Sequence, residues 1–424
     1  MPTTEASGAP DPRAPRPSPA SPFRCGHEDG WHGRNPFDPS FRADPYPHLA
    51  HLREFDPVNL TPVGLWRLTR FADVERILKD VPTGVRTSSG DLPGRVGEVE
   101  ARPAEFMLSQ DPPNHTRLRK LVSKAFTPRA VERLRERIQA IADEQIARVL
   151  ARGEMDVIAD LALPVPATMI CEMMGVPLAD RDRFTVWTAD ATHVLAAPFA
   201  PPDLIERGVA AGDALRGYFE SLIEARRRNL GEDILSDLIR AEEDGDQLTP
   251  SELVSQSIGL LIAGFETTIG LIGNGVLALI RHPDQLALLR ERPELLPNAI
   301  DECLRYDGPI LLTVRVLRED TAFGDTTIPK DAMVFAMLAG ANRDPARYRD
   351  PDRFDVARDD HSPLGFGGGI HYCLGAHLAR MEAQVAIGTL VRSVRDLALA
   401  TDDLAWGRSL FRVLDRLPVT FRPA

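Results

Sequence analysis

The chain is poor in cysteine: it has four in 424 residues, at Cys25, Cys171, Cys303 and Cys373. So few cysteines in so long a chain exclude a fold held together by disulfides, and they favour the reducing cytoplasm as its location. Cys171 and Cys303 lie within apolar helical patterns, so we interpret both as small buried hydrophobic residues.

The sequence also lacks an excess of positive charge. Lysine and arginine number 50 against 62 aspartate and glutamate, which gives a net charge of −12. This balance excludes nucleic-acid binding through bulk electrostatic attraction, although it leaves room for a local basic face. The N-terminus has no charged and apolar regions of the signal-peptide type. Residues 1–24 are rich in proline, alanine and serine, and they are predicted to form a disordered tail.

One apolar run, residues 257–280, is long enough to span a bilayer. Glu266 lies near its centre, where a carboxylate costs about 2.5–3.5 kcal/mol, and no second span or basic flanking cluster accompanies it. A helix that is apolar on all sides is also typical of the centre of a large soluble protein. We therefore expect a buried central helix and no membrane span.

The pattern along the chain predicts a mostly helical protein with small sheets, although length alone would predict two or three domains. The long helix should begin at the capping box Thr249-Pro250-Ser251-Glu252 and end near Arg281, before His282-Pro283. The other expected elements are two strands and a helix within 57–80, a loop-like segment at 82–110, helices between 112 and 292 with proline-rich breaks at 164–166 and 198–202, a β-rich patch at 310–338 with a hairpin turn at Gly324-Asp325, and a helix at 374–394.

The sharpest motif is FGGGIHYCLG at residues 366–375, in which Cys373 stands where a glycine-rich loop meets a helix. The amides and partial positive charge of a helix N-terminus favour thiolate over thiol, and a thiolate is a ligand for haem iron. The glycines would let the backbone approach a flat macrocycle, and His371 could reach a haem propionate. The alternative is a glycine loop that cradles phosphate beside an incidental cysteine; the glycines alone fit both readings.

This segment resembles the haem signature of the cytochrome P450 family, bacterial soluble type, which reads Phe-Gly-x-Gly-x-His-x-Cys-x-Gly. The resemblance extends over almost the whole chain after the tail, because other family motifs recur in the family's order. One departure is His377, where close relatives often have proline; it affects only local packing. Every fixed position of the signature matches, at Phe366, Gly367, Gly369, His371, Cys373 and Gly375.

A second motif, AGFETT at residues 263–268, lies midway along the predicted long helix. Glycine weakens a helix, and a threonine hydroxyl can bond the carbonyl four residues back, so a local bulge is expected there. Taken alone, a glutamate on a buried helix is more typical of a structural salt bridge. The resemblance implies instead that Glu266 and Thr267 are the family's acid–alcohol pair, which delivers protons to dioxygen.

Glu302 and Arg305 are three residues apart on a predicted helix, a spacing that at a surface gives only a weak ion pair. The resemblance implies a buried network on the cysteine side of the haem, with Arg353 as its third member. We interpret these three residues as assembling the fold rather than taking part in catalysis.

His115 and Arg119, one helical turn apart, are candidate anchors for the haem propionates, together with Arg315. Propionates are anions, to which arginine offers a bidentate fork. On their own, His115 and Arg119 would more simply be helix-surface residues; their register with the family's pattern implies the anchoring role. Phe366, Gly367 and His371 of the signature complete the predicted haem-binding set.

Two weaker features remain. Residues 25–32 contain one cysteine and two histidines, but they lie at the edge of the tail and lack a fourth zinc ligand at standard spacing. Arg117, Lys120, Lys124 and Arg129 form a local basic patch. This patch could dock an acidic redox partner, or it could be a solvated helix face.

The resemblance implies a single-domain, mainly α cytochrome P450 fold with small β-sheets over residues 25–424. It also implies haem b as cofactor, O2 as co-substrate, and insertion of one oxygen atom into an apolar small molecule by hydroxylation or epoxidation. Electrons should come from a separate ferredoxin and its reductase, since the chain has no iron–sulfur cysteine motif and no flavin or nicotinamide fingerprint.

The substrate should be apolar, such as a terpenoid, steroid, fatty acid or macrolide, because apolar residues dominate the segments expected to bound its pocket. Leu108, Ala263 and Leu311 are the predicted contacts. The bounding segments are the loop 82–110, the linker near 195–203, the long helix around 259–263, and residues 310–313.

Two other classes of haem protein remain open. A sensor or carrier without turnover would not need an acid–alcohol pair. A peroxide-driven enzyme usually replaces that pair with substrate-binding charge. The intact Glu266-Thr267 pair favours the monooxygenase over both.

Overall fold

The computed structural model describes residues 38–424, apart from 62–63, 92–104, 197–200, 244–247, 361 and 408–410. The predicted tail at 1–24 and the candidate zinc segment at 25–32 therefore lie outside the described residues.

Helices make up most of the described chain. They are α1 (Pro39–Ala43), α2 (Tyr46–Phe55), α3 (Phe71–Lys79), α4 (Asn114–Val122), α5 (Pro128–Glu132), α6 (Arg135–Leu150), α7 (Pro164–Met174), α8 (Arg181–Ala191), α9 (Pro202–Arg227), α10 (Ile234–Glu243), α11 (Pro250–Arg281), α12 (Pro283–Glu291), α13 (Leu296–Asp307), α14 (Leu338–Ala341) and α15 (Ala376–Ser393). Short 3-10 turns connect several of them, among them η1 (Met107–Ser109).

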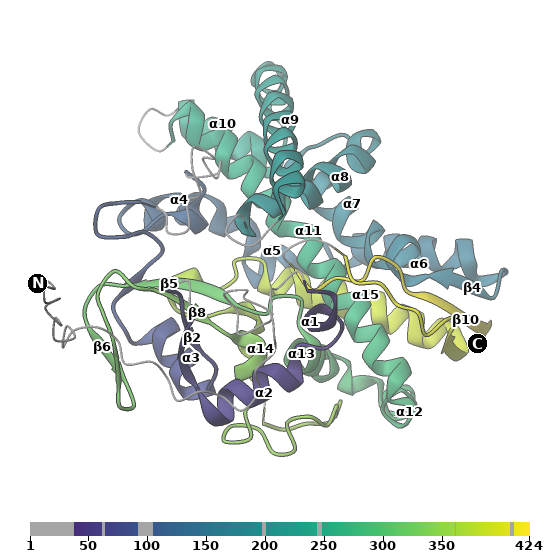
Figure 1. Ribbon diagram of the computed structural model, residues 1–424. Coiled ribbons are helices and arrows are strands. Elements are labelled where there is room, and N and C mark those ends of the chain that lie inside the picture. Colours follow the sequence, from purple (N-terminus) through teal and green to yellow (C-terminus); the bar gives the residue numbers. More distant parts are fainter. Residues whose placement is uncertain are drawn as a thin grey trace, which may run out of the picture.

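Helix α11 runs through the middle of the molecule, with α8, α9 and α10 on one side and α6 and α15 on another (Figure 1). It begins as predicted, because Thr249 and Glu252 form a reciprocal capping box. It ends at Arg281, just before His282 and Pro283, since a residue that precedes proline avoids the helical conformation. By length and composition α11 could cross a membrane, but 78% of its most apolar window is buried inside the fold. The predicted central buried helix is confirmed.

The strands form three small sheets in the described part of the chain. The largest has the order β1-β2-β8-β5-β3 and lies beside α2, α3 and α14 (Figure 1). Its β2–β8 pair is parallel and aligns Trp66 with Val334, so it joins the two β-rich patches of the sequence. The strands are β1 (Val58–Leu60), β2 (Trp66–Leu68), β3 (Thr83–Gly84), β4 (Glu154–Asp156), β5 (Thr313–Leu317), β6 (Thr321–Phe323), β7 (Thr326–Ile328), β8 (Met333–Ala336), β9 (Val394–Leu399) and β10 (Pro418–Pro423).

The predicted hairpin turn at Gly324-Asp325 is confirmed, since it joins the antiparallel strands β6 and β7.

The predicted proline-rich break at 164–166 is wrong. Pro164 and Pro166 lie in the first turn of α7, where proline is tolerated because the first amide groups of a helix have no helical partner. Most of the second predicted break, 198–202, falls on residues that are not described.

The expected bulge within the AGFETT segment is also wrong, because α11 remains α-helical throughout. The local cause that we expected is nevertheless present: the Thr267 hydroxyl donates to the Ala263 carbonyl at 3.2 Å. One such back-bond is tolerated here without a change of helix type.

Candidate active site

The loop at residues 366–375 is closed by a backbone hydrogen bond from the Cys373 N–H to the Phe366 carbonyl, at 3.0 Å. Gly367 has a φ of +70°, a conformation that favours glycine. Gly369 has a φ of +66°, and an added Cβ there would lie 2.2 Å from the carbonyl oxygen of Leu78 in α3. The backbone therefore requires these two glycines, and Cys373 stands just before α15, as predicted.

Cys373 is exposed as a residue, but protein surrounds its thiol group on most sides. The resulting burial raises the pKa of the thiol, while the Gly375 N–H and the guanidinium groups of Arg119 and Arg380 oppose this. A metal cation bound to the sulfur would deprotonate it, so the site suits a metal-ligating cysteine.

Three nitrogen-bearing side chains, His115 and Arg119 from α4 and Arg315 from β5, lie near His371 of this loop. Together they form a cluster of four. The rings of His115 and His371 lie with centroids 4.3 Å apart. Both ring nitrogens of His115 and the Nε2 of His371 are buried without a hydrogen-bond partner in the described part of the chain. Burial, together with the nearby cations, lowers the pKa of His371 to about 3.

Within the described ranges, none of these four side chains forms an ion pair with a carboxylate. Arg119 instead donates to the Tyr372 carbonyl at 2.6 Å, which ties α4 to the cysteine loop. Two of the four side chains, His115 and Arg315, are buried and the other two are half-buried, and such donors without acidic partners suit an anionic ligand. The residues present therefore fit haem: this cluster would hold its two carboxylates, and Cys373 would bind its iron.

Between Leu253 and Leu279, α11 is buried except for Ile262–Gly264 and Thr267. Ala263 is exposed and Thr267 is half-buried, whereas Glu266 is only 7% exposed. The predicted acid and alcohol are thus adjacent in the chain but differ in environment, because only the alcohol lies on the accessible part of the helix.

The predicted substrate contacts differ in their surroundings. Leu108 is 54% exposed and Ala263 is exposed, so both side chains are accessible to a ligand. Leu311 is half-buried and packs against a small core cluster that contains Leu49 and Met337.

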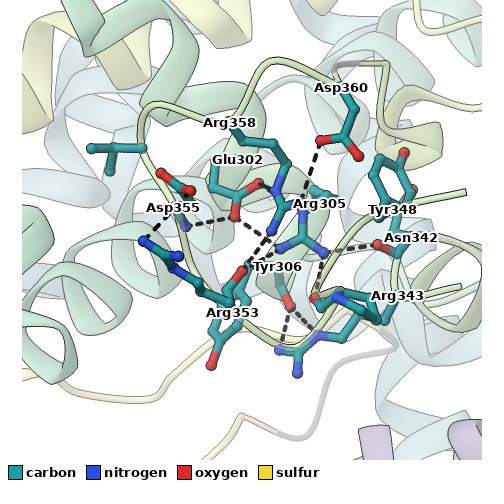
Figure 2. A network of polar contacts seen from close by, with 12 residues as sticks. Glu302, Arg305, Tyr306, Asn342, Arg343, Tyr348, Arg353, Asp355, Arg358 and Asp360 are labelled. Atoms are coloured by element: carbon teal, nitrogen blue, oxygen red, sulfur yellow. Dashed lines mark hydrogen bonds and ion pairs between the residues drawn. The ribbon is translucent and has the colours of Figure 1, made fainter. Parts of the chain in front are cut away.

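The predicted pair of Glu302 and Arg305 forms the centre of a buried polar network (Figure 2). The Glu302 carboxylate accepts two hydrogen bonds from Arg305, at 2.7 and 2.8 Å, and one from Arg358 at 3.2 Å. Arg305 also donates to the backbone carbonyls of Asn342, Pro351 and Arg353. This pair is therefore structural and buried, far from the weak surface pair that its spacing alone would suggest.

The assignment of Arg353 as the third side chain of this network needs correction. Its side chain is 61% exposed and lies 3.8 Å from Asp355, while its backbone carbonyl accepts from both Arg305 and Arg358 (Figure 2). Arg358 is the third member of the network, because its guanidinium binds Glu302, and it is 7% exposed. Sequence reasoning missed Arg358 because Arg353 and Arg358 lie in the same irregular segment, only five residues apart. The path of this loop in the folded protein decides which of the two side chains points inward.

Sequence reasoning also missed Glu382 on α15. This side chain is buried, and neither carboxylate oxygen has a hydrogen-bond partner within the described residues. Burial raises the pKa of Glu382 well above its ordinary value, and the neighbouring Thr268 hydroxyl opposes this only in part. The available signal was a single carboxylate in an apolar helical run, MEAQVAIGTLV at residues 381–391.

Comparison with known proteins identifies the family of this chain. The family model for cytochrome P450 matches residues 98–395. The chain is 43% identical over 399 residues to cytochrome P450 107B1 of Saccharopolyspora erythraea, covering 90% of this chain and 96% of that protein. It is 42% identical to vitamin D(3) 25-hydroxylase of Pseudonocardia autotrophica, covering 91% and 96%.

A solved structure of the myxobacterial cytochrome P450 CYP267B1 in complex with myristic acid has a TM-score of 0.83 and 39% identity, covering 91% of this chain and 98% of that one. The resemblance, the single-domain mainly α fold and haem as cofactor are confirmed, and the phosphate-loop alternative is excluded. The chain therefore belongs to the cytochrome P450 family and is a haem-thiolate monooxygenase.

Proposed function

We propose that this enzyme inserts one atom of O2 into an apolar small molecule, by hydroxylation or epoxidation. The observation that carries the proposal is the accessible part of α11, where Ile262–Gly264 and the Thr267 hydroxyl interrupt an otherwise buried helix. This surface is apolar apart from one hydroxyl, which suits an apolar ligand beside a proton donor. Relatives support the substrate class, since one is named for vitamin D(3) and another was solved with myristic acid.

Haem, when bound, supplies the activation of O2 with Cys373 as its thiolate ligand. We assign its carboxylates to the buried His115 and Arg315 and the half-buried Arg119 and His371. Phe366 and Gly367 would lie against its cysteine face, as the signature implies.

We assign proton delivery to Thr267 and Glu266. The Thr267 hydroxyl can donate and accept at once, so it can receive a proton from one neighbour while it passes its own to another. Its bond to the Ala263 carbonyl, at 3.2 Å, is long enough to exchange for a stronger partner. Glu266, the adjacent carboxylate, would resupply the proton.

Electrons should come from a ferredoxin-type partner that docks on the basic patch near the cysteine loop. Lys120, Lys124 and Arg129 are exposed and remain available for this. Arg117 does not contribute, because it forms an ion pair with Glu252 of α11. We expect the enzyme to work in the cytoplasm, where such partners are found.

Absorption spectra test the proposal. The reduced protein exposed to carbon monoxide should show a strongly red-shifted Soret band, and Cys373→Ala should abolish it. Product formation should then require ferredoxin, reductase and NAD(P)H. A histidine-type spectrum that survives the substitution, or turnover with peroxide alone, would contradict the proposal.

A further inference from the structure

The segment that precedes Leu108 is clamped onto α11 by one buried side chain. Gln256 is fully buried, and both ends of its amide bind the backbone of this segment. Its Oε1 accepts from the Met107 N–H at 3.2 Å, and its Nε2 donates to the Glu105 carbonyl at 2.8 Å. Because donor and acceptor are used together, the segment can sit in only one register on the helix.

A glycine one turn further along α11 makes room for the ring that this clamp positions. An added Cβ at Gly259 would lie 2.3 Å from the ring of Phe106. Three atoms of the Phe106 ring lie within 2.6 Å of that position, so the ring packs directly on the helix there, and Phe106 is only 6% exposed. Any side chain at position 259 would displace it.

Gln256, Gly259, Ala263 and Thr267 share one face of α11, because their spacings are three or four residues. The clamp therefore occupies the same face as the accessible Ala263 and Thr267. With a rise of 1.5 Å per residue, Gly259 and Thr267 are separated by about 12 Å along the helix axis.

We propose that Phe106, held in place by Gln256 and Gly259, closes one end of the substrate-facing face of α11. It thereby limits how far a substrate can extend from Thr267, and so selects for apolar chains that fit within about 12 Å of helix. Gln256 and Gly259 are positioning residues, since they act through Phe106. This inference rests on the proposed function, which makes the accessible face of α11 the place of the substrate.

A series of 1-alkylimidazoles with alkyl chains from methyl to dodecyl tests whether Phe106 limits the chain length, with the haem-loaded protein. The imidazole nitrogen ligates the iron, so titration of the Soret shift gives a dissociation constant while the alkyl chain extends from a known point. In the wild type, affinity should rise about threefold to fourfold per added methylene until the chain meets Phe106, and then stop rising. Phe106→Ala should move this break to longer chains while methylimidazole binds as before.

Gly259→Ala is the second variant, and it should also move the break because it displaces the ring. The control is Gly212→Ala on α9, where an added Cβ meets nothing within 4 Å and the break should stay in place. A break at the same chain length in the wild type and both variants would overturn the inference, while the proposed function would stand. Failure of every azole to ligate the iron of the wild type would overturn both.

Discussion

Among single residues, Thr267 combines two properties that its neighbours on α11 do not share. Its side chain is accessible, whereas Thr268 is buried, and it carries a hydroxyl that Ile262, Ala263 and Gly264 lack. Its hydroxyl donates to the Ala263 carbonyl at 3.2 Å, a long bond that is compatible with the proposed role in proton delivery.

Thr267→Ala should divert electrons to release of peroxide. We expect the ratio of product to NAD(P)H consumed to fall about tenfold or more, because a positioned proton donor contributes at least that much. The matched control is Ser257→Ala, which removes a buried hydroxyl bonded to a helix carbonyl at 2.8 Å on the same helix. Unchanged coupling in Thr267→Ala would remove the proposed role.

Burial of Glu382 should make the stability of the folded protein depend on pH. Below the ordinary glutamate pKa, both the folded and the unfolded chain hold the proton, so the ionisation of this group does not change stability. Above it, the unfolded chain releases the proton while burial keeps it on the folded chain, so this group lowers stability as pH rises.

Glu382→Gln should therefore raise the free energy of unfolding at pH 7.5 relative to the wild type, with a difference that shrinks towards pH 4.5. Urea denaturation of the haem-loaded protein at several pH values measures this. The exposed Glu136 on α6 provides the control, since Glu136→Gln should leave the pH dependence unchanged. A difference that is independent of pH would show that the carboxyl is not neutral in the folded state.

At the scale of elements, the Glu302 network joins the end of α13 to the loop before the cysteine segment (Figure 2). Arg305 donates hydrogen bonds to three backbone carbonyls of the irregular region between α14 and residue 360. A region without regular structure depends on such bonds, because its backbone polar groups have few other partners.

Two neighbouring arginines give a matched test of this network. Arg358→Met should lower the free energy of unfolding by about 3–5 kcal/mol, because it leaves part of the buried Glu302 charge uncompensated. Arg353→Met should change it by less than about 0.5 kcal/mol, since the exposed guanidinium is lost but the backbone carbonyl remains. Urea denaturation compares them, and equal effects would reject the corrected assignment.

For the whole molecule, the net charge is −12, yet basic side chains gather around α4 and the cysteine loop. Such a local face can steer an acidic partner to one side of an acidic protein. The ion pair between Arg117 and Glu252 reduces this face, and it also ties α4 to the start of α11.

Reversing two of these charges should slow electron transfer without affecting the fold. The double variant Lys120→Glu and Lys124→Glu should lower the rate of reduction by an acidic ferredoxin about tenfold at low salt, with a smaller effect at high salt. Stopped-flow reduction measures this rate. Lys330→Glu, an exposed charge in the turn between β7 and β8, is the control. A similar loss in the control would indicate a bulk charge effect instead of docking.

Features that depend on neighbours along the chain were predictable from the sequence. The capping box of α11, the hairpin at Gly324-Asp325 and the cysteine signature each rely on residues within one or two turns of each other. Local spacing gave a wrong prediction at Pro164 and Pro166, because proline disrupts the interior of a helix but is tolerated in its first turn. Both residues lie in the first turn of α7.

The amino-acid sequence was sufficient to predict the mainly α fold, haem as the cofactor, and four of the side chains that gather at the cysteine loop. Only the tertiary structure decided that Arg358 turns inward instead of Arg353, that Glu382 is buried beside Thr268, and that Phe106 lies on Gly259. The physical reason is that these outcomes depend on packing between segments far apart in the chain, such as positions 106 and 259. A local sequence pattern does not indicate which distant segment will pack against it.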